Sequence, residues 1–250
     1  MLASERTRYI MSQLNKKGII NLKDVAHDLE ISEATVRRDF EKLENEGRLR
    51  RVTGGAALND GLGTDNLVEL TVRSKKDINY DGKLRVAKRA CEYIEEGDCV
   101  FIDGGTSTAA MAQFLEKRNI HIVTHSELLL RSMTNPVAEI ILIGGSYLPH
   151  YSMSVGTLAQ QMIRQFHFDK AFISCTGADI ADDTAFVNEI DTMTIKQLAM
   201  ENSDINFLLL DSGKINRRRL CRFSALSDFK RVICDDSPEL KNIPEFFELV

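Results

Sequence analysis

The sequence of 250 residues lacks the long hydrophobic segments of a membrane protein. No apolar run approaches the roughly 18 consecutive residues that cross a bilayer as a helix. The opening stretch "MLASERTRYIMSQLNKKG" also lacks the continuous apolar core of a signal peptide. Hydrophobic residues make up 43% of the chain and charged residues 28%, which is ordinary for soluble globular proteins. We therefore expect a cytoplasmic protein that has no membrane partner and is long enough for two domains.

Cysteine is scarce, and its spacing argues against two kinds of stabilising site. The five cysteines are odd in number and none belongs to a CxxC pair, so we expect neither a disulfide framework nor a zinc cluster. His121 and His125 suggest a metal site, but "NIHIVTH" has the apolar, β-branched character of a strand. Four positions along a strand separate two side chains by about 13 Å, which is too far to chelate one ion. We expect no metal ion.

The net charge of −5 is unevenly distributed along the chain. Residues 58–82 are rich in Asn, Asp and Gly, which predicts a linker. Before it, residues 1–57 hold 11 lysines and arginines against 9 aspartates and glutamates, whereas residues 58–250 hold 21 against 28. The acidity therefore lies outside the N-terminal part and does not limit what that part binds. We predict domains at residues 1–57 and 83–250.

Three short helices are predicted before residue 47. The first spans about Glu5–Lys17. The second opens at Asn21 and the third at Ser32, both good N-cap residues, and the third ends before Gly47, which suits a left-handed turn. Because the second and third helices are joined by the short "EI" turn, they form a helix-turn-helix.

The third helix divides into two faces at about 100° per residue. Val36, Phe40 and Leu43 fall in one narrow sector, which we expect to face the core. On the outward side, Arg38 and Lys42 are one turn apart and would repel each other unless a polyanion lay against them. The residues that we expect on the nucleic-acid side are Ser32, Ala34, Thr35, Arg37, Arg38 and Lys42.

The stretch "RLRRVTGGAAL" follows the third helix and predicts a β-hairpin wing. Such a wing would carry Arg48, Arg50 and Arg51 towards a phosphate backbone. A single arginine is more often a solvated charge. A helix-turn-helix, a basic outward face and a basic wing within 57 residues together favour binding to double-stranded DNA.

The run "GIINLKDVAHDLEISEATVRRDFEKLENEGRLRRVTGGA" resembles the winged helix-turn-helix of the DeoR family of bacterial transcription regulators. The hallmark of that family is "SEATxRRDL…LexxGxlxRxxGGA", and Phe40 stands here where Leu is usual. The resemblance implies a sequence-specific transcription regulator, most often a repressor of a carbohydrate-metabolism operon.

From Lys83 onward, short apolar strands alternate with amphipathic stretches. The predicted strands are "CVFID", "IHIVTH", "EIILIGG", "KAFISCTGA", which ends near Ala178, "INFLLLD" and "RVICDD". Continuous apolar strands separated by helices are typical of a parallel sheet covered on both faces. The expected fold class is α/β, with a Rossmann-like parallel sheet behind a small winged helix-turn-helix domain.

Five of these strands finish in polar or glycine-rich tails: "DGGTST", "THS", "GGS", "TGAD" and "DSGK". One such tail is more often a plain turn, but ligands of open α/β sheets bind beyond the carboxyl ends of the strands, where five tails would converge. In the first tail, Thr106 and Ser107 begin a helix whose N–H groups suit a phosphate. The chain has no Walker lysine and no GxGxxG, so we expect a small phosphorylated metabolite in place of a nucleotide. Lys196 and Lys214 are candidates to neutralise it.

These tails also resemble the sensor domain of the DeoR family. The family's "DxGTT" appears as Asp103 to Ser107, "TNS" as Thr124 to Ser126 with His125 replacing the usual Asn, "GG" as Gly144 and Gly145, and "DssK" as Asp211 to Lys214. The resemblance implies a fold related to ribose-5-phosphate isomerase and the CoA transferases, a phosphorylated sugar as effector and no cofactor. The expected effector-binding residues are Asp103, Gly104, Gly105, Thr106, Ser107, Thr124, His125, Ser126, Gly144, Gly145, Gly177, Lys196, Asp211 and Lys214.

An enzyme is the alternative from another class. A sugar-phosphate isomerase or deaminase could carry a DNA-binding domain, with Asp103, Asp211, Lys196 and Lys214 as acid–base groups. No catalytic histidine or carboxylate dyad stands out by its spacing, so we favour a regulator without catalytic activity. Since helix-turn-helix proteins usually bind repeated half-sites, we expect a homodimer or homotetramer.

Overall fold

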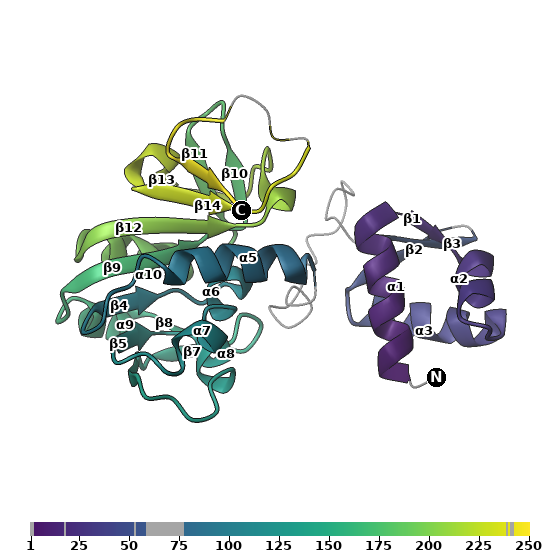
Figure 1. Ribbon diagram of the computed structural model, residues 1–250, viewed down its shortest axis with the longest axis horizontal. Helices are drawn as coiled ribbons and strands as arrows, with labels where there is room; N and C mark the ends of the chain where they lie inside the picture. Colours follow the sequence, from purple (N-terminus) through teal and green to yellow (C-terminus); the bar gives the residue numbers. More distant parts are fainter. Residues whose placement is uncertain (1–2, 18, 53, 59–77, 239, 241–242) are drawn as a thin grey trace. The chain divides into compact units, whose positions relative to one another are not determined.

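The computed structural model describes residues 3–17, 19–52, 54–58, 78–238, 240 and 243–250 (Figure 1). The chain forms two compact units, Met1–Asn79 and Tyr80–Val250. Most of the predicted linker, residues 59–77, lies outside the described residues, and a helix already begins at Tyr80, within the last part of that prediction. None of the helices in the described segments has the length and apolar character that crossing a membrane requires.

The first unit has the predicted winged helix-turn-helix fold. Its elements are α1 (Ala3–Lys17), β1 (Ile19–Asn21), α2 (Leu22–Asp28), α3 (Glu33–Asn45), β2 (Leu49–Val52) and β3 (Gly55–Leu58). The predicted hairpin β2–β3 is joined by β1, a strand that was not predicted, in an antiparallel sheet of order β1-β3-β2. One core, which includes Leu14, Val25, Phe40 and Leu49, fills the space between the helices and the sheet.

Side chains at the helix ends define the helix-turn-helix geometry. Asn21 Oδ1 accepts a hydrogen bond from the Lys23 N–H at 2.8 Å, and Ser32 Oγ accepts one from the Thr35 N–H at 3.2 Å, so both predicted N-caps are confirmed. Gly47 ends α3 with φ +70°, a conformation that suits glycine. The chain therefore leaves α3 directly into the wing.

A seven-stranded sheet forms the centre of the second unit. Its strands are β4 (Cys99–Ile102), β5 (His121–Thr124), β6 (Glu139–Leu142), β9 (Phe168–Ser174), β12 (Ser203–Leu210), β14 (Arg231–Cys234) and β15 (Phe247–Leu249). The order is β15-β14-β12-β9-β4-β5-β6, and every neighbouring pair is parallel. The predicted parallel sheet is confirmed, and β15 is an addition to it.

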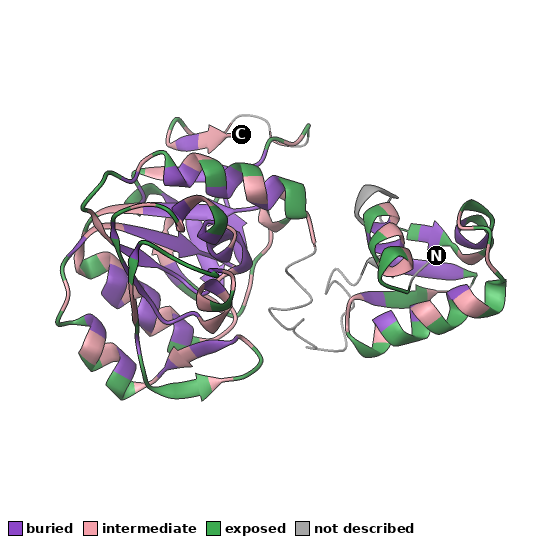
Figure 2. Cartoon of the chain, turned by 60° about the horizontal axis from the view of Figure 1, so that its bottom comes forward, coloured by how far each residue is buried: buried purple, intermediate pink, exposed green. Residues whose placement is uncertain are grey.

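Helices cover both faces of this sheet, because apolar side chains leave each strand in both directions. One core joins the sheet to α5 (Tyr80–Cys91), α7 (Ala112–Leu115) and α8 (Glu127–Arg131). The other joins it to α9 (Thr157–Ile163) and α10 (Ile190–Glu201). Figure 2 shows the buried sheet between helices whose outer surfaces are exposed.

The fourth predicted strand, "KAFISCTGA", is two strands. β9 ends at Ser174, and β10 (Gly177–Asp179) belongs to a separate antiparallel sheet with β11 (Thr184–Val187) and β13 (Cys221–Ala225). The break occurs because the Thr176 N–H donates to the Phe186 carbonyl at 2.9 Å, which draws the chain away from the parallel sheet. A hairpin of β7 (Ser146–Leu148) and β8 (Met153–Val155) was also not predicted.

Candidate functional sites

Helix α3 has one buried and one exposed face, as its sequence predicts. Val36, Phe40 and Leu43 are buried, whereas the residues expected on the opposite side are exposed, apart from the half-buried Thr35. In the described part of the chain, Arg37 and Arg38 form no ion pair. Lys42 Nζ lies 3.9 Å from Glu46 Oε1, and 68% of the Lys42 side chain is exposed. Both arginines are therefore presented to solvent, and Glu33 and Glu41 of the same helix are exposed as well.

Two acids of α3, Asp39 and Glu44, bind arginines of the same unit. Asp39 accepts two hydrogen bonds from the Arg6 guanidinium, at 2.6 and 3.0 Å, which ties α3 to α1. Glu44 accepts from the Arg51 backbone N–H at 2.9 Å and from Arg51 Nε at 2.5 Å. The Arg51 backbone N–H is the main reason that the pKa of Glu44 is lowered. These contacts neutralise acids that would otherwise weaken the basic face.

The three wing arginines differ in their exposure. Arg50 is exposed and forms no ion pair within the described segments, and Arg51 is exposed although it contacts Glu44. Arg48 has only 13% of its side chain exposed, and its Nη1 lies 3.5 Å from Glu46. Arg48 immediately precedes β2, whose first residue, Leu49, is buried. The structure thus presents Arg50 and Arg51 to solvent as predicted and keeps Arg48 mostly covered.

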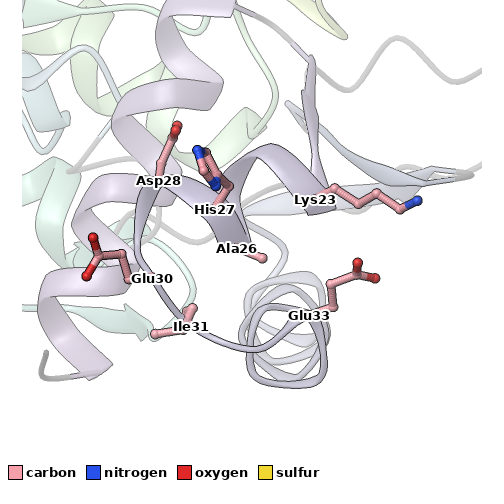
Figure 3. Close-up of a pocket in the computed structure, with 7 residues that line it drawn as sticks. All are labelled: Lys23, Ala26, His27, Asp28, Glu30, Ile31 and Glu33. Atoms are coloured by element: carbon pink, nitrogen blue, oxygen red, sulfur yellow. The ribbon is translucent and has the colours of Figure 1, made fainter.

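A pocket of about 640 Å³ lies between α2 and the start of α3 (Figure 3). Its lining residues are Lys23, Ala26, His27, Asp28, Glu30, Ile31 and Glu33. Three carboxylates among these seven residues make the pocket a poor site for a phosphate, since like charges repel. Its lining residues belong to the first unit, whereas the residues predicted to bind the effector belong to the second.

In the second unit, a buried carboxylate follows β4. Asp103 is fully buried, and its Oδ2 accepts hydrogen bonds from Lys196 Nζ, the Ser174 hydroxyl and, at 2.9 Å, the Ser174 N–H. Burial alone would raise the pKa of Asp103, but the charge of Lys196 and the hydrogen bond from His125 outweigh it and hold that pKa well below its usual range. Three predicted residues therefore meet here, together with Ser174, which was not predicted.

His125 occupies a supporting position. Its Nε2 lies 3.1 Å from Asp103 Oδ1, and its Nδ1 donates to the Ser154 carbonyl of β8 at 3.0 Å. The residue is fully buried, and both ring nitrogens are engaged by the protein. His125 thus links the carboxylate of Asp103 to the β7–β8 hairpin, a contact that its place in the sequence does not reveal.

A second charged group follows β12. Lys214 Nζ lies 3.3 Å from Asp211 Oδ2. Burial alone would raise the pKa of Asp211. The positive charges of Lys214 and Lys83 lower it by more, so the pKa of Asp211 lies below its usual value. Lys83, in the first turn of α5, was not predicted. The sequence did indicate that Lys83 is buried, because Lys83 shares the helical spacing of the buried residues Val86 and Ala87.

Cys175, which follows β9, lies within electrostatic reach of both charged groups. Burial raises the pKa of the Cys175 thiol to about 11, and the charges of both Lys214 and Lys196 act on it in the opposite direction. Nearby, after β4, the Ser107 hydroxyl is buried without a hydrogen-bond partner among the described residues. A buried hydroxyl of this kind is costly unless a ligand or water satisfies it.

Several other predicted residues have local structural contacts. Thr124 Oγ1 donates to the Ile102 carbonyl at 2.6 Å, and Ser126 Oγ caps α8 at the Leu129 N–H. The glycines 104, 105 and 177 allow close approach, because a Cβ at each would collide with Met153, Ser174 and the Arg217 carbonyl respectively. Thr106 lies in α6 (Thr106–Ala109) and is buried, whereas Gly144 and Gly145 are exposed beyond β6.

The arrangement defines a class of protein. One unit is a winged helix-turn-helix with an exposed basic face, and the other is an α/β domain with buried charges at the carboxyl ends of its strands, where such sheets bind ligands. This is a DNA-binding regulator with a separate sensor domain.

The family of this regulator follows from comparison with known proteins. Residues 6–61 match the DeoR-like helix-turn-helix domain, and residues 78–236 match the DeoR C terminal sensor domain. The chain belongs to the DeoR family of transcription regulators, as its motifs predict.

Two relatives match along almost the whole chain. The lactose phosphotransferase system repressor of Lactococcus lactis subsp. lactis is 31% identical over 250 residues, covering 98% of this chain and 96% of that protein. The uncharacterised HTH-type transcriptional regulator FruR of Bacillus subtilis (strain 168) is 30% identical over 243 residues, covering 96% and 94%.

Solved structures are more distantly similar. Ribose 5-phosphate isomerase A from Methanocaldococcus jannaschii is 16% identical, with a TM-score of 0.40 over 55% of each chain. The full-length sorbitol operon regulator SorC from Klebsiella pneumoniae is 12% identical, with a TM-score of 0.35 over 84% of this chain and 91% of that one.

Proposed function

We propose that this protein represses a carbohydrate-metabolism operon and that a phosphorylated sugar, bound at the carboxyl edge of the second unit, changes its affinity for the operator. The names of the relatives support repression of sugar uptake or metabolism. The observation that carries the effector part is the presence of two ion pairs, Asp103 with Lys196 and Asp211 with Lys214, at the carboxyl ends of the strands. The buried Ser107 hydroxyl, which has no hydrogen-bond partner among the described residues, follows one of these strands.

On the DNA side, α3 enters the major groove with Ala34, Thr35, Arg37 and Arg38 towards the base edges. The N-terminal part of a recognition helix makes such contacts in helix-turn-helix proteins. Lys42, Arg50 and Arg51 contact phosphates, which gives affinity without sequence preference. Ser32 has a further role as the cap that fixes the start of α3.

On the effector side, the lysines supply charge and the carboxylates supply hydrogen-bond acceptors for sugar hydroxyls. Lys214 has 20% of its side chain exposed and is the more accessible of the two lysines, so it is the better placed to meet a phosphate. Ser107 donates its unused hydroxyl proton to the same anion. Asp103 is held in place by His125 and Ser174.

We also propose that the protein acts without catalysis, as a cytoplasmic homodimer or homotetramer. Lys196 is held on Asp103 and Lys214 lies beside Asp211, so each lysine has a carboxylate partner in place. An ion-paired lysine is protonated and makes a poor general base. Two-fold symmetry would match the paired half-sites of an operator.

A thermal-shift screen of hexose, pentose and triose phosphates with the full-length protein tests this proposal. We expect at least one sugar phosphate to raise the midpoint of unfolding, its unphosphorylated sugar to have no effect, and the bound compound to be recovered unchanged. Turnover of the stabilising compound, or no stabilisation by any sugar phosphate, would overturn the proposal.

A further inference from the structure

The seven-stranded sheet of the second unit has two edge strands, β15 and β6. At the β15 edge, side chains of α5 hold the strand: Arg85 Nε donates to the backbone oxygen of Val250 at 3.2 Å, and the Tyr93 hydroxyl donates to Glu248 at 2.6 Å. At the other edge, no strand in the described part of the chain pairs with the outer side of β6. An open edge of this kind is a template for pairing with another chain.

The backbone of β6 has two residues whose polar groups point away from the sheet. The N–H groups of Glu139 and Ile143 donate to carbonyl groups on the β5 side, at 3.0 and 2.8 Å. Because the ladder between two strands engages every second residue, Ile140 and Leu142 present their N–H and C=O groups to the open side. These outward groups have no hydrogen-bond partner among the described residues.

The side chains along this edge are apolar and incompletely covered. Ile140 and Ile141 point to opposite faces of the sheet, and each is only partly buried although it packs against one of the two cores. Leu142 is 41% exposed, and Val137 and Tyr147, before and after β6 in the chain, are 59% and 47% exposed. No lysine or proline, residues that commonly block pairing at an open edge, occurs in β6.

A second copy of β6 fits this edge. Two outward-facing residues that lie opposite each other in an antiparallel pair exchange two hydrogen bonds. If Ile140 of each copy lies opposite Leu142 of the other, every outward group of both residues is satisfied. The two Ile141 residues then meet at the two-fold axis, with Cα atoms about 4.5 Å apart. Each partly buried isoleucine thereby gains an apolar cross-strand neighbour.

The charge on β6 is compatible with this register. Glu139 of each copy lies opposite Ile143 of the other, so the two Glu139 residues are about 13 Å apart along the strands and do not repel each other strongly. Within its own subunit, Glu139 Oε2 lies 3.2 Å from His121 Nε2 of β5.

We propose that the open edge of β6 is the interface of a homodimer, in which antiparallel pairing of β6 with β6 joins two seven-stranded sheets into one continuous sheet. This rests on the self-association that the proposed function includes, and it names the surface. The pairing is isologous, because the same residues of both copies form it, so it closes at two subunits and builds no filament. A tetramer would need a second interface elsewhere.

The first test compares Leu142→Lys with Leu158→Lys in the full-length protein. A lysine at position 142 is tolerated within one subunit, where Leu142 is already exposed, but places a charge against Ile140 of the other copy. Leu158, which is 71% exposed on α9, is the matched control. Sedimentation equilibrium over a concentration series measures the dissociation constant of the dimer. We expect L142K to raise it at least about tenfold and L158K to leave it at the wild-type value.

The second test places a cysteine at the predicted two-fold axis. Ile141→Cys brings two thiols together at the close spacing of a non-hydrogen-bonded pair, where a disulfide can form. Mild oxidation should link most of the I141C protein into covalent dimers. The wild type, with its five native cysteines, and the exposed-site variant L158C should remain unlinked under the same conditions.

A wild type that sediments as a monomer at every concentration would overturn this inference and the proposed homo-oligomer, and would leave control by a sugar phosphate untouched. An unchanged dissociation constant in L142K, an equal weakening in L158K, or no cross-link in I141C would overturn this inference alone. Circular dichroism and the midpoint of thermal unfolding show whether L142K is folded. If it is not, the cross-link decides, and the absence of covalent I141C dimers overturns the inference.

Discussion

Arg37 and Arg38 are exposed on α3, and two acids of the same helix have other partners. Asp39 binds Arg6, and Glu44 binds Arg51, so these two carboxylates are directed away from the basic face, whereas Glu33 and Glu41 are exposed. The second turn of α3 then carries two guanidinium groups that form no ion pair within the described chain. A polyanion is the complement that this face lacks.

The first prediction concerns Arg38. We expect Arg38→Ala to weaken operator binding by about 1–3 kcal/mol, or roughly 5- to 150-fold, because a base or phosphate contact is lost. Fluorescence anisotropy with an operator fragment, repeated at several salt concentrations, measures this change. Arg164→Ala removes an exposed cation from the second unit and should leave the Kd unchanged. Equal losses of operator affinity in the two variants would show that net charge alone, and not a contact made by Arg38, sets the affinity.

The second prediction concerns Asp103 and pH. The pKa of Asp103 in the folded protein lies below its ordinary value of 3.8, chiefly because Lys196 and His125 outweigh the effect of burial. A carboxyl group with a lowered pKa stabilises the fold at pH values above its unfolded pKa, and that stability is lost as the pH falls through the folded value. The unfolding midpoint should therefore fall as the pH drops below about 5.

Asp103→Asn should remove part of this acid dependence. The variant leaves Lys196 buried without its carboxylate and should lose about 3–5 kcal/mol of stability at pH 7. Thermal unfolding of both proteins between pH 7 and pH 3 gives the comparison. A slope in the variant as steep as in the wild type would show that Asp103 carries none of the acid sensitivity.

Residue roles were predictable where helical geometry decides them. The outward face of α3 follows from 100° per residue, and the N-caps follow from Asn21 and Ser32. The supporting role of His125 depends on the Ser154 carbonyl, 29 positions away. Helical spacing predicts that Lys83 is buried, but the group that it faces depends on the path of α5 over β15. Contacts between distant segments of this kind leave no local pattern in the sequence.

At the scale of elements, the turn between β4 and α6 is the most constrained part of the sensor. Asp103 forms its contacts because Gly104 and Gly105 let the chain turn within contact distance of Met153 and Ser174. Thr108 Oγ1 closes the turn on the carbonyl groups of Asp103 and Gly105, both at 2.8 Å. Both the Asp103 carboxylate and the Ser107 hydroxyl are carried by this turn and the start of α6.

The third prediction compares two glycines. A Cβ at position 105 would collide with the Ser174 side chain, which is buried and hydrogen-bonded to Asp103, so Gly105→Ala should destabilise the second unit by about 1–3 kcal/mol. A Cβ at position 144 meets nothing within 4 Å, and Gly144→Ala should leave stability within about 0.5 kcal/mol of the wild type. Chemical denaturation measures both. Similar stability in the two variants would contradict the described packing.

Elements differ in how far the sequence predicts them. The strands of the parallel sheet were predictable because continuous apolar runs mark strands buried on both faces. The short strands β10, β11 and β13 were not, since each has three to five residues and Phe186 pairs with Arg222 far along the chain. Gly177 therefore begins β10, although the sequence predicted it as part of the tail that follows β9.

At the scale of the whole molecule, each unit has its own hydrophobic core. One core draws on residues from Ile10 to Ala56, and the two others draw on residues from Val86 onward. DNA binding and effector binding therefore belong to separately packed units. Effector control requires a free energy of coupling between them, typically 1–3 kcal/mol.

The operator Kd, measured with and without the sugar phosphate that stabilises the protein, tests the central claim most directly. The account predicts that this compound weakens operator binding by about 5- to 150-fold, and that the operator weakens binding of the compound by the same factor. An operator Kd that is unchanged at saturating sugar phosphate would contradict it.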